Sequence, residues 1–345
     1  MKAWVLHDIG DIRYEEVSKP NPAAGEALLR VGAAGICGSD IPRIYDTGAH
    51  RMPLIPGHEF AGEVTETGEG VDGSWTGKRV GVFPLIPCRK CSQCKAGRYE
   101  LCRDYDYVGS RRDGAFAEYV TVPVTNLIEL PQNVSFEEAA MLEPMAVAVH
   151  AIRRVMGIDG TDHDVKIAVY GLGTIGMFIT MFLKAAGFNN LMLIGNKDSQ
   201  REKIDSMGIS EDCYYDNSIK TDHGSADIVF ECVGRTQTYV EAIDIAAPMG
   251  KVMLVGNPYS DMTLPRNTYW KILRNQLTVM GTWNSSFTGD PDDDWHYVLD
   301  LLGSGLIEPA RFISHRFPLK DLREGFDIIH EKWEEYGKVV MTGLQ

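Results

Sequence analysis

The sequence has no long apolar run and little positive charge. None of its 345 residues belongs to a stretch of about 18 uninterrupted apolar residues that could span a bilayer. Its first residues lack the charged and apolar regions of a signal peptide. Lys and Arg number 34 against 48 Asp and Glu, a formal net charge of −14, and a field of this sign repels phosphate backbones and anionic lipids. We therefore expect a cytoplasmic protein with neither a nucleic-acid nor a membrane partner.

Cysteine is also scarce and is unevenly placed. Of seven cysteines, four occur in the spacing Cys88-x2-Cys91-x2-Cys94-x7-Cys102. An odd count with one tight cluster is more typical of metal binding in a reducing compartment than of a disulfide framework. Four thiolates on one short loop suit a closed, tetrahedral structural zinc site. An iron–sulfur cluster is the main competitor, and the domain context below disfavours it.

The composition is that of a folded globular protein, and the length favours two domains. Apolar residues make up 44% and charged residues 24% of the chain. Up to about residue 130, short strands separated by glycine and proline predict a compact, mostly antiparallel barrel. The expected strands are Ala27–Val31, Gly62–Thr65, Arg79–Phe83 and Ala117–Val122.

From Val165 the pattern changes to alternating buried strands and helices. An apolar run, Val165–Tyr170, precedes a helical pattern over Ile175–Ala186. This alternation predicts a parallel, doubly wound sheet. Further strands are expected at Asn190–Ile194, Asp227–Cys232, Lys251–Gly256 and Leu277–Gly281, and helices of the tail at Trp295–Gly303 and Leu319–Glu335.

The predicted fold class is therefore α/β with two domains. Residues 1–149 and 284–345 are expected to form the barrel-containing catalytic domain, because the tail is too short to be a third domain and should return to the first. Residues 150–283 are expected to form the nucleotide-binding domain, inserted into the catalytic one.

A second set of metal-binding residues lies in the barrel part of the chain. A catalytic zinc typically has three protein ligands and one exchangeable position. Cys37, His58 and a carboxylate from Glu59 or Glu143 would supply such a set. Each residue alone means little, because a lone histidine or cysteine is more often structural.

Several motifs together resemble the zinc-containing medium-chain alcohol dehydrogenase family. They are Gly57-His58-Glu59-x2-Gly62-x5-Gly68-x2-Val71, Cys37-Gly38-Ser39-Asp40, the four-cysteine lobe, a glycine-rich nucleotide fingerprint and Gly337-Lys338-Val339. Their order matches the family's, so the resemblance spans nearly the whole chain. It implies a GroES-like catalytic domain, a Rossmann domain, and two zinc ions per chain, one catalytic and one structural.

The resemblance also implies roles for individual residues. Zinc would act as a Lewis acid on a substrate hydroxyl, which gives its hydride to a nicotinamide. Ser39 resembles the hydroxyl that takes the substrate proton, and Asp40 the carboxylate that orients the His58 ring. Glu143 stands where simple alcohol dehydrogenases often have a second cysteine ligand, as in the sorbitol-dehydrogenase-like branch. The two glutamates, Glu59 and Glu143, could exchange on the metal.

The nucleotide fingerprint is Gly171-x-Gly173-x2-Gly176, directly between a strand and a helix. There it allows a pyrophosphate to approach a helix N-terminus, with Thr174 and Ile175 inside the motif. The acid that normally binds the ribose hydroxyls is missing, because the next strand runs into Gly195-Asn196-Lys197. Glycine leaves room for a 2′-phosphate that Asn196, Lys197 and Arg201 can bind, which favours NADP(H) over NAD(H).

Two points keep the cofactor prediction open. Asp198 would restore an acid if the strand ended three residues later, so NAD(H) remains the alternative. Lys338 resembles a basic residue of the family that reaches the cofactor pyrophosphate, although a solvated lysine is an equal alternative.

Within the family, the chain looks closest to the polyol-phosphate branch, which includes galactitol-1-phosphate 5-dehydrogenases. Arg43 stands six residues after Cys37, where sorbitol dehydrogenases tend to have an aromatic residue, and its guanidinium could bind a substrate phosphate. Arg111 and Arg112 could add to such a pocket, or be surface charges. His50 is a further catalytic candidate in the same cleft.

The alternatives are an NADPH-linked ribulose-5-phosphate reductase, a sorbitol-type enzyme and a simple secondary alcohol dehydrogenase. The complete zinc-binding set argues against a zinc-free quinone reductase and against a non-catalytic, nucleotide-sensing relative. By analogy with the family, we expect a homodimer or homotetramer built through the edge strand of the nucleotide domain.

Overall fold

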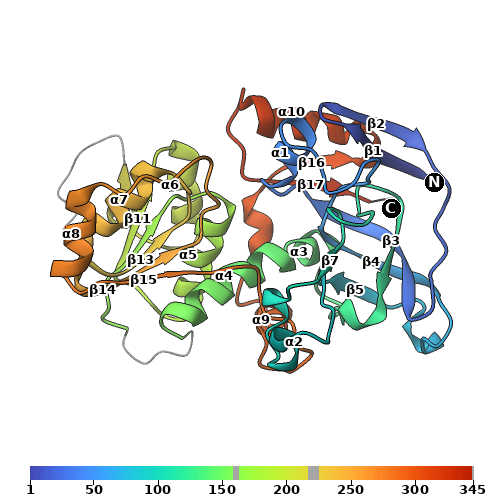
Figure 1. The fold of residues 1–345 in the computed structure, drawn as a ribbon, viewed down its shortest axis with the longest axis horizontal. Helices are drawn as coiled ribbons and strands as arrows, with labels where there is room; N and C mark the ends of the chain where they lie inside the picture. Colours follow the sequence, from blue (N-terminus) through green and yellow to red (C-terminus); the bar gives the residue numbers. More distant parts are fainter. Residues whose placement is uncertain (158–162, 217–224, 344–345) are drawn as a thin grey trace. The chain divides into compact units, whose positions relative to one another are not determined.

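The structure is a computed structural model that describes residues 1–157, 163–216 and 225–343. It divides into two compact units. Unit 1 comprises Met1–Glu143 and Ser286–Gln345, and unit 2 comprises Pro144–Ser285. Figure 1 shows strand-rich architecture in unit 1 and a sheet flanked by helices in unit 2. Each unit is described by itself.

Unit 1 is built on a seven-stranded, mostly antiparallel sheet in the order β16-β17-β3-β4-β5-β9, with β8 also paired to β3. The pairing of β16 with β17 is parallel, and the others are antiparallel. Two small sheets, β1-β2 and β6-β7, accompany it. The strands are β1 (Lys2–Asp8), β2 (Asp11–Glu16), β3 (Glu26–Gly35), β4 (Glu59–Thr67), β5 (Arg79–Val82), β6 (Leu85–Ile86), β7 (Asp106–Tyr107), β8 (Tyr119–Pro123), β9 (Leu127–Glu129), β16 (Ile313–Pro318) and β17 (Lys338–Thr342).

Short helices connect these strands. They are α1 (Asp40–Tyr45), α2 (Ser92–Lys95), α3 (Phe136–Ala140), α9 (Asp294–Gly303) and α10 (Leu322–Glu331). The sequence predicted a longer final helix, reaching Glu335. α10 ends sooner because its C-cap, Lys332, adopts the left-handed conformation at φ 57°, which stops the helical hydrogen-bond pattern.

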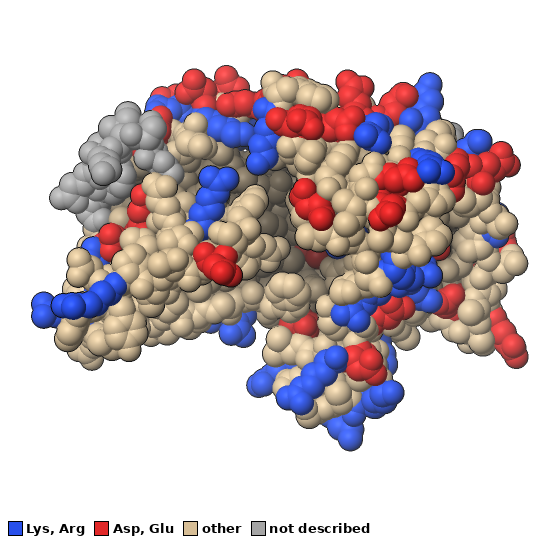
Figure 2. Space-filling model, turned by 45° about the horizontal axis from the view of Figure 1, so that its top comes forward, with Lys and Arg blue, Asp and Glu red and all other residues tan. Residues whose placement is uncertain are grey.

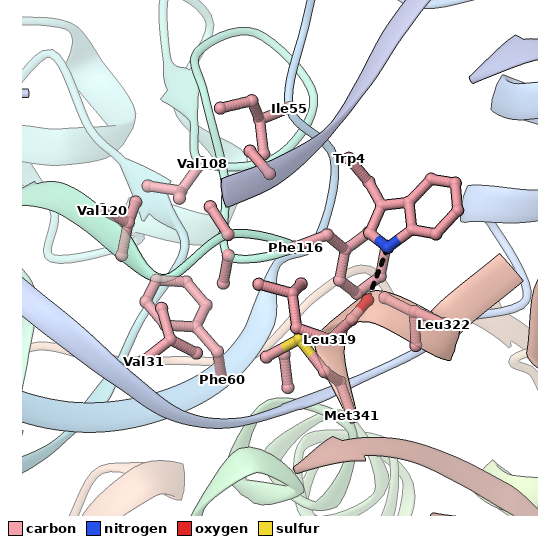
Figure 3. Close-up of a cluster of buried hydrophobic side chains, with 14 of the residues drawn as sticks. Trp4, Val31, Ile55, Phe60, Val108, Phe116, Val120, Leu319, Leu322 and Met341 are labelled. Atoms are coloured by element: carbon pink, nitrogen blue, oxygen red, sulfur yellow. Dashed lines mark hydrogen bonds between the residues drawn. The ribbon is translucent and has the colours of Figure 1, made fainter. Parts of the chain in front are cut away.

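The hydrophobic core of unit 1 joins the beginning and the end of the described chain. Trp4 of β1 donates from Nε1 to the carbonyl oxygen of Leu319 at 2.6 Å (Figure 3). Its ring meets the edge of Phe326 of α10 at 5.9 Å, and Phe326 also packs against Phe116 at 5.3 Å. Together with the pairing of β17 with β3, these contacts hold the C-terminal segment in unit 1.

Unit 2 contains a six-stranded parallel sheet in the order β12-β11-β10-β13-β14-β15. The chain order reverses between β10 and β13, which is the switch point where doubly wound sheets bind ligands. The strands are β10 (Ile167–Tyr170), β11 (Leu191–Gly195), β12 (Tyr214–Asp216), β13 (Ala226–Glu231), β14 (Ala246–Leu254) and β15 (Thr278–Gly281). The helices are α4 (Leu142–Val155), which begins at the end of unit 1, α5 (Thr174–Ala185), α6 (Asp198–Ser206), α7 (Thr236–Asp244) and α8 (Arg266–Arg274).

The predicted fold class is confirmed: an antiparallel, GroES-like part and a Rossmann-type parallel sheet. The sequence analysis missed β12, because its three residues, Tyr-Tyr-Asp, are too few to show a strand pattern.

The surface carries charges of both signs. Figure 2 shows many acidic side chains along the upper part of the visible face and basic side chains gathered on the projection at the bottom of the view. Within the described part of the chain, no helix combines the length and apolarity that a membrane span requires.

Candidate metal and cofactor sites

Three metal-binding side chains converge in unit 1. Cys37 lies just after β3, His58 directly precedes β4, and Glu59 is the first residue of β4. Antiparallel pairing places Gly35 of β3 opposite Glu59, which brings these two segments together. One ligand atom from each of the three residues lies within 4.8 Å of the others. Ligands at about 2.0–2.3 Å from a tetrahedral zinc lie about 3.3–3.8 Å apart, so the three atoms would have to draw somewhat closer together to bind zinc.

The turn before His58 depends on glycine. Gly57 has φ 99°, a left-handed conformation that other residues rarely adopt. A Cβ atom there would lie 2.7 Å from the Phe116 ring. The Gly-His-Glu pattern therefore reflects both the ligands and the turn that presents them.

Asp40, the first residue of α1, contacts two residues of the three-ligand set and also Arg43. It is fully buried, and its Oδ1 lies 3.3 Å from His58 Nδ1. Its Oδ2 accepts from the Cys37 amide at 3.0 Å, and Arg43 Nη1 donates to Oδ1 at 2.5 Å. Burial opposes ionisation of Asp40, but His58 and Arg43 outweigh it and lower its pKa. His58 Nδ1 is buried without a well-directed hydrogen bond, so Asp40 acts on it mainly as a nearby negative charge.

Glu59 is paired with a lysine from the C-terminal strand. Lys338 of β17 donates from Nζ to Glu59 Oε2 and, at 3.0 Å, to the carbonyl oxygen of Ile36. Both charged residues are only 2% exposed. Gly35 makes room for this pair, since a Cβ there would lie 2.5 Å from Glu59 Oε2. The sequence analysis weighed a cofactor pyrophosphate against solvent as the partner of Lys338; the structure buries this lysine against Glu59, and its role toward the cofactor stays a prediction.

The second candidate carboxylate, Glu143 at the start of α4, lies outside the three-ligand set. Its Oε1 accepts from the Tyr107 hydroxyl at 3.4 Å. Burial raises the pKa of Glu143 to about 7, and the nearby Glu59 carboxylate acts in the same direction. Tyr107 also meets the His58 ring edge-on at 5.7 Å. The sequence analysis missed Tyr107, because a tyrosine in a two-residue strand carries no motif.

The four cysteines of the lobe come together as predicted from their spacing. Cys88, Cys91, Cys94 and Cys102 place their sulfur atoms within 4.8 Å of one another, on and around α2. Backbone N–H groups of Cys94 and Arg103 lower the pKa of Cys91 to about 6. Such donors favour the thiolate form that binds metal. The set has no open fourth position for substrate, as a structural zinc site requires.

The glycine-rich loop of unit 2 has the shape of a phosphate cradle. It joins β10 to α5, and Gly173 is the N-cap of that twelve-residue helix. A Cβ at Gly173 would meet nothing within 4 Å, whereas one at Gly176 would lie 2.0 Å from the Gly171 carbonyl oxygen. Gly173 thus leaves open space at a helix N-terminus, and Gly176 lets helix and loop pack closely. Thr174 and Ile175 form the first turn of α5.

The expected 2′-phosphate site follows β11. Gly195 is the last residue of this strand, one residue after the predicted end, and Asp198 is exposed at the start of α6, so the strand does not extend to Asp198. Lys197 donates its amide hydrogen to the Tyr214 hydroxyl at 3.1 Å. Arg201 stacks over the Tyr214 ring at 4.5 Å.

The three arginines proposed for a substrate phosphate do not share one recess. Arg43 lies against Asp40, as described. Arg111 stacks on Tyr105 at 4.3 Å, and Arg112 forms ion pairs with Glu26 and Asp106 at 3.0 and 3.2 Å. Arg111 and Arg112 line a cavity of about 690 Å³ formed with the β1-β2 hairpin, and Arg43 is not among its lining residues. His50 is exposed between α1 and β4.

Comparison with known families matches both units. The alcohol dehydrogenase GroES-like domain matches residues 23–132, and the zinc-binding dehydrogenase family matches residues 174–304.

Individual relatives match over nearly the whole chain. Galactitol 1-phosphate 5-dehydrogenase of Escherichia coli (strain K12) is 32% identical over 324 residues, 92% of each chain. The crystal structure of galactitol-1-phosphate dehydrogenase from Escherichia coli has a TM-score of 0.89 and 31% identity, covering 99% of this chain and all of that one.

Two further solved structures contain different cofactors. A zinc-binding dehydrogenase from Sinorhizobium meliloti 1021, bound to NADP, has a TM-score of 0.87 and 29% identity, covering 99% of this chain and 98% of that one. A dehydrogenase from Escherichia coli CFT073, complexed with NADH, has a TM-score of 0.87 and 26% identity, covering 99% of each chain.

Proposed function

The chain belongs to the zinc-containing medium-chain alcohol and polyol dehydrogenase family, and from this premise we propose that it oxidises a secondary hydroxyl of a polyol phosphate with NADP. The single observation that carries the substrate proposal is the position of Arg43. Its guanidinium contacts Asp40, and Asp40 contacts the candidate zinc ligand His58. The Arg43 guanidinium is therefore linked to the candidate zinc ligand His58 through Asp40. At this position it can bind the phosphate group of a substrate.

Arg43 keeps binding capacity beyond its contact with Asp40. Only Nη1 donates to Asp40, and the side chain is 16% exposed. A guanidinium has five N–H donors in a planar fork that suits phosphate oxygens. One part of the fork can therefore hold Asp40 while the other binds a phosphate group.

The reaction divides between the chain's residues as follows. Cys37, His58 and Glu59 would hold the catalytic zinc, which when bound polarises the substrate oxygen. With the cofactor bound, a hydride with its two electrons would pass from the secondary carbon to the nicotinamide ring. The hydroxyl proton would pass to Ser39, which would release its own hydroxyl proton outward to solvent. In the structure Ser39 Oγ lies 3.3 Å from Cys37 Sγ, beside the metal position. Asp40 orients His58, and the loop from Gly171 to Gly176 binds the cofactor pyrophosphate.

The cofactor proposal rests on Gly195 together with Asn196, Lys197 and Arg201. An acidic residue at the end of β11 would bind the ribose hydroxyls of NAD, and this chain has none there. We assign NADP as the preferred cofactor and NAD as the alternative, since the solved relatives include both.

The test is a panel of substrates assayed at 340 nm. Galactitol 1-phosphate, galactitol, sorbitol and 2-butanol are oxidised with NADP or NAD, and ribulose 5-phosphate is reduced with NADPH or NADH. We expect turnover with phosphorylated substrates and a preference for NADP(H). Equal use of galactitol and galactitol 1-phosphate would refute the phosphate proposal while leaving the zinc chemistry intact.

Arg43→Lys supplies the sharper measurement. The readout is the ratio of kcat/KM for galactitol 1-phosphate to that for galactitol, because any disturbance of Asp40 affects both substrates alike. Lysine keeps the charge and loses the fork. A charge-assisted hydrogen bond contributes about 1.5–3 kcal/mol, so we expect the ratio to fall about tenfold or more. Arg111→Lys, in the separate cavity, should leave the ratio unchanged.

The assembly and the compartment are also proposals. β15 is one of the two outer strands of the described sheet, and large apolar side chains near it are exposed, which favours a homodimer through this edge. Four cysteines within reach of one another stay reduced in the cytoplasm, which is the proposed compartment.

A further inference from the structure

Gln200, in the first turn of α6, connects the two loops of the proposed cofactor site. Its Oε1 accepts from the amides of Asn196 and Lys197 at 3.0 and 3.2 Å. Its Nε2 donates to the carbonyl oxygen of Leu172 at 3.0 Å, within the glycine-rich loop. The side chain therefore links the loop after β10 to the loop after β11.

Gln200 forms more hydrogen bonds than a residue that only caps a helix. A glutamine at the third helical position often reaches back to the N-cap amide, and the bond to Lys197 is of this kind. The bond to Leu172 lies 28 residues away in sequence and does not serve the helix end. Gln200 is only 8% exposed, and its amide uses both of its ends.

Only an amide satisfies this arrangement. The Leu172 carbonyl can only accept, and the two backbone N–H groups can only donate, so the network needs a donor and an acceptor on one side chain. A glutamate of the same shape would lose the donor to Leu172. It would also place a negative charge beside the two amides.

Gln200 also occupies the space in which an acid would sit. A Cβ at Gly195 would lie 2.3 Å from Gln200 Oε1 and 3.0 Å from both Leu172 Cδ1 and Tyr214 Cε2. Any side chain at the end of β11, aspartate included, would therefore require the glutamine amide to shift and break its present hydrogen bonds. The neutral amide fills the position and leaves no charge there to repel a phosphate.

We propose that Gln200 sets the cofactor preference of this chain. It disfavours a side chain at position 195 and fixes the Asn196–Lys197 backbone beside Arg201, so that the side chains of Asn196, Lys197 and Arg201 can bind a 2′-phosphate. Tyr214 assists, because its hydroxyl bonds Lys197 and its ring carries Arg201. The inference rests on the proposed use of NADP and makes Gln200 a positioning residue, since it acts through its neighbours.

The experiment measures binding without turnover. Dissociation constants of NADP⁺ and NAD⁺ are determined by calorimetry for the zinc-loaded protein and for Gln200→Glu and Gln200→Met. We expect the ratio Kd(NAD⁺)/Kd(NADP⁺) to fall at least tenfold in Gln200→Glu, through charge repulsion and the lost bond to Leu172. Gln200→Met, which is similar in shape and uncharged, should lower the ratio by less.

Gln237→Glu is the matched control, because Gln237 is an exposed glutamine on α7 of the same unit. It should leave the ratio unchanged. A ratio within twofold of the wild type in both Gln200 variants would overturn the inference, even if the wild type prefers NADP⁺. A wild type that prefers NAD⁺, with a further tenfold shift in Gln200→Glu, would refute the proposed NADP use and still support the role of Gln200.

Discussion

Asp40 contacts two of the three candidate zinc ligands as well as Arg43. The sequence motif alone does not show these contacts. Its two oxygens meet the Cys37 amide, His58 Nδ1 and Arg43 Nη1. It is fully buried, holds the backbone of Cys37 and places a negative charge 3.3 Å from the ring of His58.

Asp40→Asn should weaken the binding of catalytic zinc. The variant keeps the shape and loses the charge that faces His58, and changes of this kind lower metal affinity about 10–100-fold. The measurement is competition for zinc with a chromogenic chelator. Asp46→Asn, an exposed change just after α1, is the control. Unchanged zinc affinity in Asp40→Asn would show that the carboxylate does not support the site.

At the residue scale, local sequence motifs identified the candidate metal ligands but not the side chains that form hydrogen bonds around the sites. The cysteines of the lobe, and Cys37 with His58 and Glu59, are marked by spacing within short segments. Lys338 bonds a residue 279 positions away, and Gln200 bonds Leu172 across 28 positions. These long-range hydrogen bonds depend on which strands are neighbours in the fold. A single sequence does not show that arrangement.

The four-cysteine lobe is an element with little core of its own. It lies between β6 and β7, which are two residues each, and its helix α2 has four residues. A segment of this size buries too little apolar surface to hold its shape alone. A metal ion bound by four thiolates can supply the missing stabilisation.

Cys94→Ser should release the lobe without emptying the catalytic site. Bound zinc should fall from about two to about one per chain, as the two ligand sets imply. Trypsin should then cleave among Arg89, Lys90, Lys95 and Arg98 faster than in the wild type. Metal analysis and mass spectrometry provide the readouts, with Cys213→Ser as control. A lobe that stays protected, or two zinc ions retained, would contradict a structural zinc here.

At the element scale, prediction succeeded where the pattern is clear, as in the continuous apolar runs β10 and β11 and the helical spacing of α5 over twelve residues. It did not list β1, β2, β16 and β17, although these strands have five to seven residues. Strands of two or three residues, such as β6, β7 and β12, carry too little pattern to be recognised.

At the scale of the whole molecule, the edge strand β15 of unit 2 has exposed apolar side chains around it. β15 pairs with β14 on one side and, among described residues, with no strand on the other. Exposed large apolar side chains follow it or lie on neighbouring elements of unit 2: Met249, Tyr259, Tyr269, Trp270, Leu273 and Trp283. Edges of this kind invite pairing with a second chain.

The double change Thr278→Lys with Met280→Lys should convert the proposed dimer to a monomer. Two like charges on the edge strand would face the same charges on the partner and oppose pairing. Light scattering after size exclusion measures the mass, with Leu306→Lys, an exposed change in unit 1, as control. A monomeric wild type, or a double variant that remains dimeric, would refute assembly through β15.

The order of the units along the chain was predictable, because only the middle segment shows the βα alternation. The packing that returns the C-terminal segment to unit 1 was expected from its shortness alone. The contacts that achieve it, Trp4 with Leu319 and β17 with β3, appear only in three dimensions.

The interrupted layout of unit 1 also bears on synthesis at the ribosome. Unit 2 is continuous, so it can fold as soon as residues 144–285 have emerged. The Glu59 carboxylate, by contrast, waits for Lys338, which is made 279 residues later. Until Lys338 has been synthesised, the Glu59 carboxylate has no lysine to pair with. Strand β3 likewise lacks its neighbour β17. The surroundings of the candidate zinc centre can thus be completed only after the whole of the nucleotide-binding unit has been synthesised.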